Sequence, residues 1–201
     1  MDQHTLFILL VITMAFFFDF INGFHDAANA IATIVTTGVL KPRQAVLWAA
    51  FFNFIAFFFF NLMVAKTIGS GLIDTHLVDA QLILSALIGA IFWNLLTWFY
   101  GLPSSSSHAL IGGLIGAALT KGGFATLKLA GLLKVVAGIF LSPVLGLLAG
   151  YLLMVWFSYL LRGRQKQQLD KSFKGFQLLS SALLSLTHGG NDAQKTMGII
   201  A

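Results

Sequence analysis

Long apolar stretches alternate with short polar gaps along the whole chain. The stretches at residues 5–39, 44–65, 80–120 and 135–161 dominate the sequence. A helix needs roughly 20 mostly apolar residues to cross a bilayer, and each stretch is of that order or longer. The pattern therefore predicts an all-α, polytopic transmembrane helical protein.

The first stretch contains a polar interruption. Residues 22–26 (NGFHD) separate the apolar segments 5–24 and 27–39. A glycine with neighbouring polar side chains inside a membrane segment is typical of a broken helix, whose irregular backbone must be surrounded by protein or by a water-filled cavity. We therefore expect a broken first helix over residues 5–39, followed by a helix over residues 44–65.

A serine run interrupts the third stretch. The apolar segment 80–101 leads to Pro103 and Ser104–Ser107, and the next apolar segment, 109–119, is too short to span comfortably. We predict a re-entrant hairpin over residues 80–120 with the serine run at its tip. In the alternative, both arms of this segment cross the bilayer completely.

The remaining segments define the domain organisation. A predicted helix over residues 135–161 precedes the most basic gap, residues 162–174, which we place in the cytoplasm because cytoplasmic loops are rich in Lys and Arg. We divide the chain into a first membrane repeat over residues 1–161, a basic cytoplasmic loop over 162–174, and the truncated start of a second, inverted repeat over 175–201.

Two short segments of the chain resemble each other. Residues 22–29 (NGFHDAAN) align with residues 188–195 (HGGNDAQK), and in this alignment Asp26 coincides with Asp192. An odd number of predicted crossings separates the two segments, so they point in opposite directions through the membrane. Inverted repeats with broken helices at the midplane are typical of secondary transporters.

Composition narrows the class of protein. Of the 201 residues, 58% are apolar and 9% are charged, whereas a soluble domain carries roughly 25% charged residues. The formal net charge of +5 comes from basic residues in the gaps, where they act as topology signals, so we expect no nucleic-acid partner. The chain has no cysteine, which excludes disulfides and zinc–thiolate sites.

Acidic and amide side chains in the first stretch are candidates for cation binding. An aspartate inside an apolar membrane segment is costly and indicates function. Asp26 and Asn29 are three residues apart and share one helical face, and Asp19 and Asn22 add to this polar stripe. Carboxylate and amide oxygens suit Na⁺, or a buried carboxylate can carry a proton.

The serine run is a candidate anion site. Ser104, Ser105, Ser106 and Ser107 precede the short helix that begins near His108. Their hydroxyls gather with unpaired backbone N–H groups at a helix N-terminus, which favours negative charge. Simple N-capping needs one hydroxyl and not four, so the run favours an oxyanion such as phosphate. His108 either donates to that anion or packs structurally.

Sequence motifs of enzymes are absent. The chain contains no G-x-S-x-G nucleophile motif and no G-x-x-x-x-G-K-[ST] phosphate loop. We therefore expect a protein that is not an enzyme and that has no cofactor apart from a coupling ion.

Three motifs in this order resemble the inorganic phosphate transporter (PiT) family. They are residues 23–30 (GFHDAANA), 103–108 (PSSSSH) and 190–195 (GNDAQK), and the resemblance covers essentially the whole chain. Members of that family take up phosphate together with Na⁺ or protons, and some bacterial relatives carry sulfate. They are built from two inverted repeats and tend to form dimers.

The resemblance also implies roles for individual residues. The implied cation site consists of Asp26, Asn29, Asn191 and Asp192. The implied phosphate site consists of Ser104, Ser105, Ser106, Ser107, His108, Lys195 and Thr196.

These roles imply a phosphate symporter in the cytoplasmic membrane, driven by Na⁺ or H⁺, in contact with lipid and able to form a homodimer. The alternatives are a sulfate or other oxyanion carrier, or an inactive truncated fragment or subunit. The last alternative arises because family members continue to a second Ser/Thr-rich hairpin, which is not reached by residue 201.

Overall fold

The computed structural model describes residues 2–58, 71–164 and 166–200. Its elements are α1 (Gln3–Thr36), α2 (Pro42–Ala56), η2 (Thr75–Leu77), α4 (Ala80–Phe99), α5 (Ser106–Gly122), η3 (Phe124–Thr126), α6 (Leu129–Leu160) and α7 (Lys166–Ile200). Within the described ranges the only β-structure is an isolated antiparallel bridge between Ile73 and Leu127. The predicted all-α class is confirmed.

Three of these helices are long and apolar enough to cross a membrane, namely α1, α4 and α6. In contrast, α5 has 17 residues, which at 1.5 Å per residue gives a length of about 26 Å. That is less than the roughly 30 Å of a bilayer's hydrocarbon core. The choice between a re-entrant hairpin and two full crossings stays a prediction.

The first helix is continuous, so the predicted break within residues 5–39 is wrong. α1 is helical from Gln3 to Thr36. No proline interrupts it, and the side chains of Asp19, Asn22 and Asp26 find partners on other helices. Gly23 lies inside this helix without interrupting it, and its surroundings are open, because a Cβ added there would have no atom within 4 Å. The helix stops shortly before Gly38, whose φ of +69° favours glycine and ends the helical pattern.

The second helix begins two residues earlier than predicted and ends earlier within the described chain. Pro42 is its first residue, where the missing N–H of proline costs no helical hydrogen bond. α2 ends at Ala56, and residues 57–58 form a turn. The rest of the predicted helix 44–65, from residue 59 onward, lies outside the described residues.

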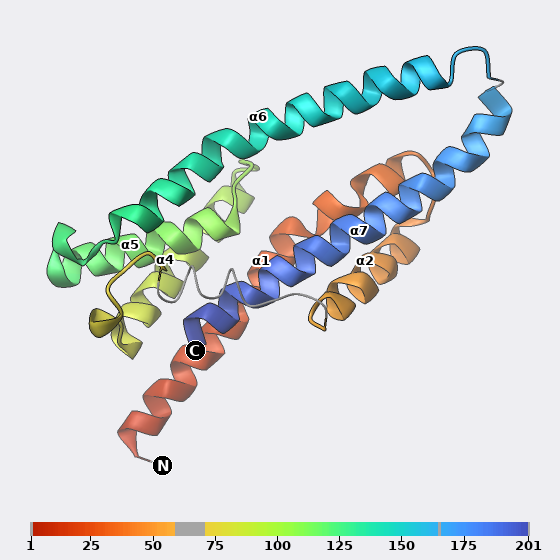
Figure 1. Ribbon diagram of the computed structural model, residues 1–201. Coiled ribbons are helices and arrows are strands. Elements are labelled where there is room, and N and C mark those ends of the chain that lie inside the picture. The colour runs from red at the N-terminus through yellow and green to blue at the C-terminus, as the bar shows by residue number, and fades with distance from the viewer. Residues whose placement is uncertain (1, 59–70, 165, 201) are drawn as a thin grey trace.

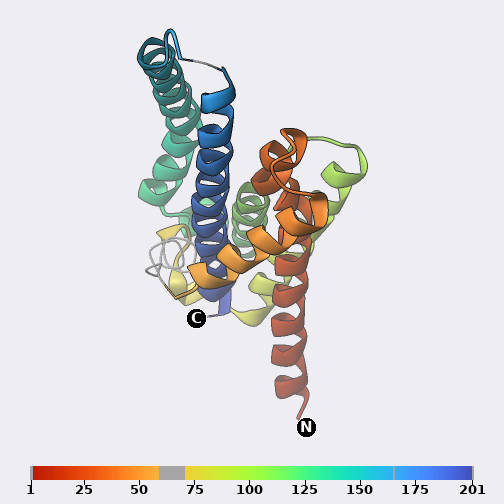
Figure 2. The same ribbon diagram turned by 90° about the vertical axis from the view of Figure 1, so that its right-hand side faces the viewer.

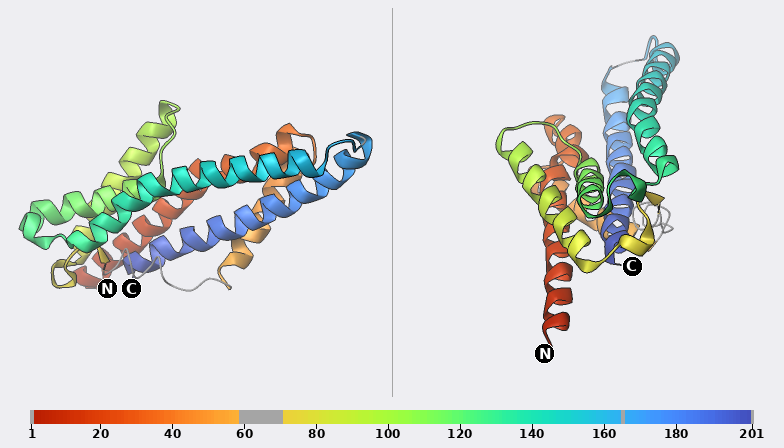
Figure 3. Two further views of the ribbon diagram at one scale, coloured as in Figure 1. Left: turned by 45° about the horizontal axis from the view of Figure 1, so that its top comes forward. Right: turned by 90° about the vertical axis from the view of Figure 1, so that its left-hand side faces the viewer.

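α4 and α5 pack as an antiparallel pair that covers the range predicted for the hairpin, residues 80–120, and extends two residues beyond it (Figure 3). Their backbones approach closely at Gly113, where an added Cβ would lie 2.4 Å from the carbonyl oxygen of Ala86. Small residues at a helix contact allow this approach. Together with α1, the pair encloses the main apolar core, which includes the fully buried Phe18 and Leu110.

Polar contacts close the end of the pair opposite the serine run. Lys121 Nζ lies 2.5 Å from Asp79 Oδ2 and donates to the carbonyl oxygen of Leu77 over 2.9 Å. The hydrogen bond from Lys121 lowers the pKa of the Asp79 carboxyl. Asp79 also caps α4 by accepting from the backbone N–H of Leu82. These contacts fix the start of α4 against the end of α5.

The predicted cytoplasmic loop over residues 162–174 is largely helical, which corrects the sequence-based boundary. Gly163, with a φ of +82°, makes the turn after α6, and α7 begins at Lys166. The first turns of α7 contain Asp170 and Lys174, whose charged groups lie 3.6 Å apart at i and i+4. Such pairs stabilise a helix. The prediction of a loop was based on the number of basic residues, which does not show whether they form such pairs.

The long apolar helix α6 has little contact with the rest of the described chain. It covers Leu129–Leu160, whereas the prediction was 135–161, and no residue in its most apolar window is buried. It meets α7 near the turn, where the rings of Phe157 and Phe173 lie 6.4 Å apart (Figure 1). Its apolar surface suits a lipid environment.

α7 runs antiparallel to α1 and packs against α2 (Figures 1 and 2). The contact with α2 is close at Gly189, where an added Cβ would lie 2.5 Å from the carbonyl oxygen of Asn53. The contact with α1 includes a hydrogen bond of 3.0 Å from Ser181 Oγ to the carbonyl oxygen of Ala30. This packing brings the two similar segments of the sequence side by side.

Replacing Gly113 by Ala is expected to lower thermal stability of the full-length protein in detergent. On helix propensity alone, Gly→Ala stabilises by about 1 kcal/mol, but the new Cβ would collide with Ala86. Gly112→Ala is the matched control on the same helix, since its Cβ meets nothing within 4 Å. An equal or higher melting temperature for Gly113→Ala than for Gly112→Ala would contradict the close α4–α5 contact.

Candidate functional site

A cluster of polar side chains lies where α1, α5 and α7 meet. It is built around Asp26 on α1, Ser106 at the start of α5, and a carboxylate, a histidine and a lysine on α7. The antiparallel packing of α1 and α7 creates this meeting point, because both similar segments then lie at the same level of the fold.

Asp26 is the point of contact between α1 and the serine run. Ser106 Oγ donates to Asp26 Oδ2 over 3.5 Å, and His25 Nδ1 lies 3.3 Å from Asp26 Oδ1. His188 Nε2 on α7 is 4.0 Å from Asp26 Oδ2. Asp26 is thus half-buried between residues from three helices.

Asp192 is the corresponding carboxylate on α7. His188 Nε2 lies 3.0 Å from its Oδ2 and Lys195 Nζ lies 2.7 Å from its Oδ1. These spacings of four and three residues place all three side chains on one face of α7. Lys195 is only 4% exposed, and it also donates to Asn22 Oδ1 on α1 over 3.3 Å. Since a buried ammonium needs such partners, Lys195 links α7 to α1.

A second link between these helices lies one turn away. The Thr196 hydroxyl donates to Asp19 Oδ1 in a hydrogen bond. Thr196 is buried and Asp19 is half-buried. Every carboxylate of α1 in this region therefore contacts a hydroxyl on another helix.

The four serines of the run have different environments. Ser104 accepts a hydrogen bond from Trp93 Nε1 over 3.1 Å, and Ser105 caps α5 by accepting from the backbone N–H of His108 over 3.4 Å. Ser106 is buried and directed to Asp26, while Ser107 is partly buried. The run is thus both a helix cap and a group of hydroxyls beside a carboxylate.

Some of the predicted site residues lie outside the cluster. The side chains of Asn29, Asn191 and His108 are exposed on the described part of the chain. The structure does bring together the other candidates, directly or through the side chain of His188: they are Asp26, Asp192, Lys195 and the serine run. The predicted roles of all these residues stay predictions.

Several polar groups near these helices were not singled out from the sequence. Asn94 on α4 is fully buried, and neither atom of its side-chain amide has a hydrogen-bond partner among the described residues. Ser185 Oγ has no hydrogen-bond partner among the described residues either, and nor has Nε2 of His25, whose place beside Asp26 in the sequence left open a functional or a purely structural role. Buried polar atoms in proteins nearly always have partners, so these groups are candidates for contact with a bound polar species. A lone Asn or Ser in an apolar stretch gives no such signal in the sequence.

Negative charge dominates the cluster. It contains the carboxylates of Asp19, Asp26 and Asp192, and Lys195 is the only lysine that the described structure places among them. A buried carboxylate is costly unless it is paired. The cluster therefore attracts cations, while the hydroxyls of the serine run beside it can donate to an anion.

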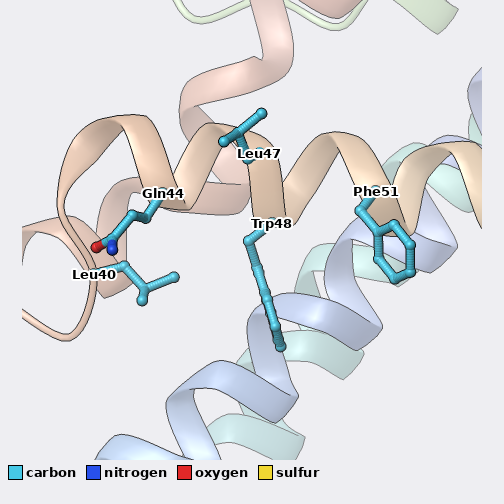
Figure 4. A pocket seen from close by; sticks show the side chains of 5 residues that line it. All are labelled: Leu40, Gln44, Leu47, Trp48 and Phe51. Carbon is cyan, nitrogen blue, oxygen red and sulfur yellow. The ribbon is translucent and has the colours of Figure 1, made fainter.

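A separate apolar pocket lies along α2. It is lined by Leu40, Gln44, Leu47, Trp48 and Phe51, and Figure 4 shows Gln44 beside Leu40 at one end and Phe51 at the other. No lining side chain carries a charge. Its polar groups are the side chains of Gln44 and Trp48, and without a charged residue it is a weaker candidate ion site than the polar cluster.

Residues 22–171 match the model of the phosphate transporter family. The chain belongs to this family. The predicted resemblance is confirmed, and the match includes both Asp26 and the serine run. The family and its named relatives are transporters, which confirms the prediction that the chain is not an enzyme.

Curated relatives carry the same assignment. The chain is 56% identical over 203 residues to a probable low-affinity inorganic phosphate transporter of Rhizobium meliloti (strain 1021), covering 100% of this chain and 61% of the relative. It is 45% identical to a protein of the same name from Bacillus subtilis (strain 168), covering 100% and 60%. The chain therefore spans about three fifths of the length of these relatives.

A solved structure shares the fold of this phosphate transporter family member. That structure, named "The sodium-dependent phosphate transporter", aligns with a TM-score of 0.81 at 24% identity, and the alignment covers 97% of this chain and 66% of the other. The likeness extends over nearly all of the described helices. It shows that the helix arrangement described above is that of a known transporter fold.

Replacing Thr196 by Val is expected to destabilise the full-length protein by about 1–3 kcal/mol, because the carboxylate of Asp19 then loses its hydroxyl donor. Thr187→Val on the same helix is the control, since the Thr187 hydroxyl bonds to its own helix at Leu183 and is exposed. Melting temperatures in detergent measure both effects. If the two variants melt together, the Thr196–Asp19 link does not hold α7 to α1.

Proposed function

We propose that this chain forms part of a secondary carrier that moves inorganic phosphate across the cytoplasmic membrane together with Na⁺ or H⁺. The observation that carries the proposal is the contact between Asp26 and Ser106, because it joins a carboxylate suited to a cation with a serine run suited to an anion. Membership of the phosphate transporter family and the names of the relatives support phosphate as the substrate.

The serine run retains donors for an oxyanion. A hydroxyl that accepts a hydrogen bond still has its own proton to donate. Ser104 and Ser105 both act as acceptors within the protein, so their O–H groups are available to phosphate. The N-terminus of α5 adds backbone N–H groups and the positive end of a helix dipole.

The position of Asp26 makes cation coupling a physical requirement of this proposal. Two like charges about 4 Å apart repel by roughly 4 kcal/mol at an effective dielectric constant of 20. Phosphate at the serine run would lie close to the Asp26 carboxylate, which is in contact with Ser106. A cation bound to Asp26, or a proton on it, removes that repulsion and allows both ions to bind together.

Na⁺ and H⁺ both suit the residues around Asp26. Carboxylate oxygens are hard ligands for Na⁺, and the solved structure that shares this fold is named as a sodium-dependent transporter. His25 and His188 lie beside the carboxylate, and imidazole nitrogens can donate or accept a hydrogen bond, so a protonated Asp26 would also have partners. Lipid, and in a homodimer a second copy of the chain, would cover the exposed apolar faces of the helices.

Asp26→Asn is expected to abolish cation-coupled phosphate uptake by the full-length protein in proteoliposomes, because the neutral amide has no negative charge to balance a cation and cannot carry a transported proton. The control is Asp170→Asn, which alters an exposed carboxylate that contacts Lys174 and should leave uptake unchanged. Radiolabelled phosphate uptake under a Na⁺ or proton gradient is the measurement. Uptake that keeps its rate and its cation dependence in Asp26→Asn would refute the role of this carboxylate.

Replacing Ser104 and Ser105 together by Ala is expected to reduce the apparent affinity for phosphate at least about tenfold. Each hydrogen bond to a charged group is worth roughly 1.5–3 kcal/mol, and about 1.4 kcal/mol corresponds to a factor of ten. Ser158→Ala is the control, because the Ser158 hydroxyl bonds to its own helix. The half-saturation constant is measured with and without sulfate as a competitor. An unchanged constant counts against the serine run, and stronger inhibition by sulfate than by unlabelled phosphate identifies sulfate as the preferred substrate.

A further inference from the structure

The lysine of the cluster occupies a position suited to a metal cation. We propose that the Lys195 ammonium is a tethered substitute for a bound cation at the contact between α1 and α7, so that Asp192 binds no mobile coupling ion. The part of this inference that concerns coupling ions rests on the proposed function. The cation position at the contact between α1 and α7 is defined by the contacts of Lys195 alone.

The contacts of Lys195 are those that a small cation would make. Its Nζ lies 2.7 Å from the carboxylate oxygen Oδ1 of Asp192 and 3.3 Å from the amide oxygen Oδ1 of Asn22. Carboxylate and amide oxygens are the protein ligands of hard cations such as Na⁺. With 4% exposure, the ammonium is enclosed between the two helices and does not extend into solvent.

The internal repeat supports this interpretation independently. When residues 22–29 are aligned with 188–195, Asp26 coincides with Asp192 and Asn29 coincides with Lys195. The first copy thus has an amide three residues after its aspartate, where the second copy has an ammonium. Since α1 and α7 lie antiparallel (Figure 1), the two copies are related positions that differ by one built-in positive charge.

The sequence-based role of Lys195 as a phosphate ligand fits its contacts less well. The ammonium is directed to Asp192 and Asn22, while the serine run is reached through Asp26. A buried ammonium that left Asp192 to bind phosphate would uncover a buried carboxylate, which is strongly unfavourable. Lys195 therefore neutralises Asp192 permanently, and Asp26 is left as the carboxylate for the mobile cation.

The test is to replace Lys195 by Asn in the full-length protein and to measure thermal stability in detergent. NaCl and choline chloride are compared at equal ionic strength. The variant has an Asp-x-x-Asn spacing in both copies and a vacated cation position. We expect NaCl to raise its melting temperature at least about 2 °C more than it raises that of the unaltered protein. Sodium-dependent uptake should also acquire a Hill coefficient higher by about one.

Lys121→Asn is the matched control, because Lys121 is also paired with an aspartate, Asp79, but at an exposed site outside the cluster. It should show no additional response to Na⁺. A second variant, Lys195→Ala, leaves room for a small cation, and we expect Na⁺ and methylammonium to stabilise it while choline does not.

The inference is overturned if neither Lys195 variant responds to Na⁺ more than the unaltered protein does. Aggregation of both variants in every salt also overturns it, because a vacated cation position should accept Na⁺. The outcome is separable from the proposed function. If the Lys195 variants gain no additional stability from Na⁺ while the unaltered protein takes up phosphate, only the tethered-cation inference is refuted. If the variants clearly gain stability from Na⁺ but the unaltered protein carries no phosphate, only the transport assignment is refuted.

Discussion

A carboxylate buried among apolar helices must be bonded or neutralised, and the packing of this protein follows from that constraint. Asp19 bonds to Thr196, Asp26 to Ser106, and Asp192 to Lys195, which in turn bonds to Asn22. Lipid tails are as apolar as leucine side chains, so burial of apolar surface alone does not select helix neighbours in a membrane. These polar links therefore fix α7 against α1 and hold the start of α5, at Ser106, beside Asp26.

Such links form only where the helix backbones approach closely enough. Glycine provides this approach at the α4–α5 contact, where Gly113 lies against Ala86, and at the α2–α7 contact, where Gly189 lies against Asn53. The first contact supports the arm that carries the serine run. The α2–α7 contact at Gly189 is adjacent in sequence to His188, whose Nε2 lies close to the carboxylates of both Asp26 and Asp192. Close packing and the polar cluster are thus two parts of one arrangement.

Periodicity and composition were enough to predict an all-α membrane protein, and three motifs were enough to identify its family. The continuity of α1 could not be predicted in the same way. A glycine with polar neighbours is compatible with either a broken or a continuous helix, and the deciding factor is whether each polar side chain has a partner. Those partners lie far along the chain: Ser106 is 80 residues from Asp26, and Lys195 is 173 residues from Asn22. The start of α7 at Lys166 was missed for a different reason, since basic residues are as common in helices as in loops.

A carrier must also return its empty binding site from one side of the membrane to the other. The charge of the site without substrate is then important. An unpaired buried ion carries a penalty of several kcal/mol even after relaxation. In the described cluster Asp192 already has Lys195, and Asp26 has only hydroxyl and imidazole contacts. The two carboxylates are therefore not equivalent although they occupy matching positions in the repeat. Under the proposed function, a permanent partner for Asp192 would lower the energetic cost of the empty state, while Asp26 would make substrate binding depend on a cation.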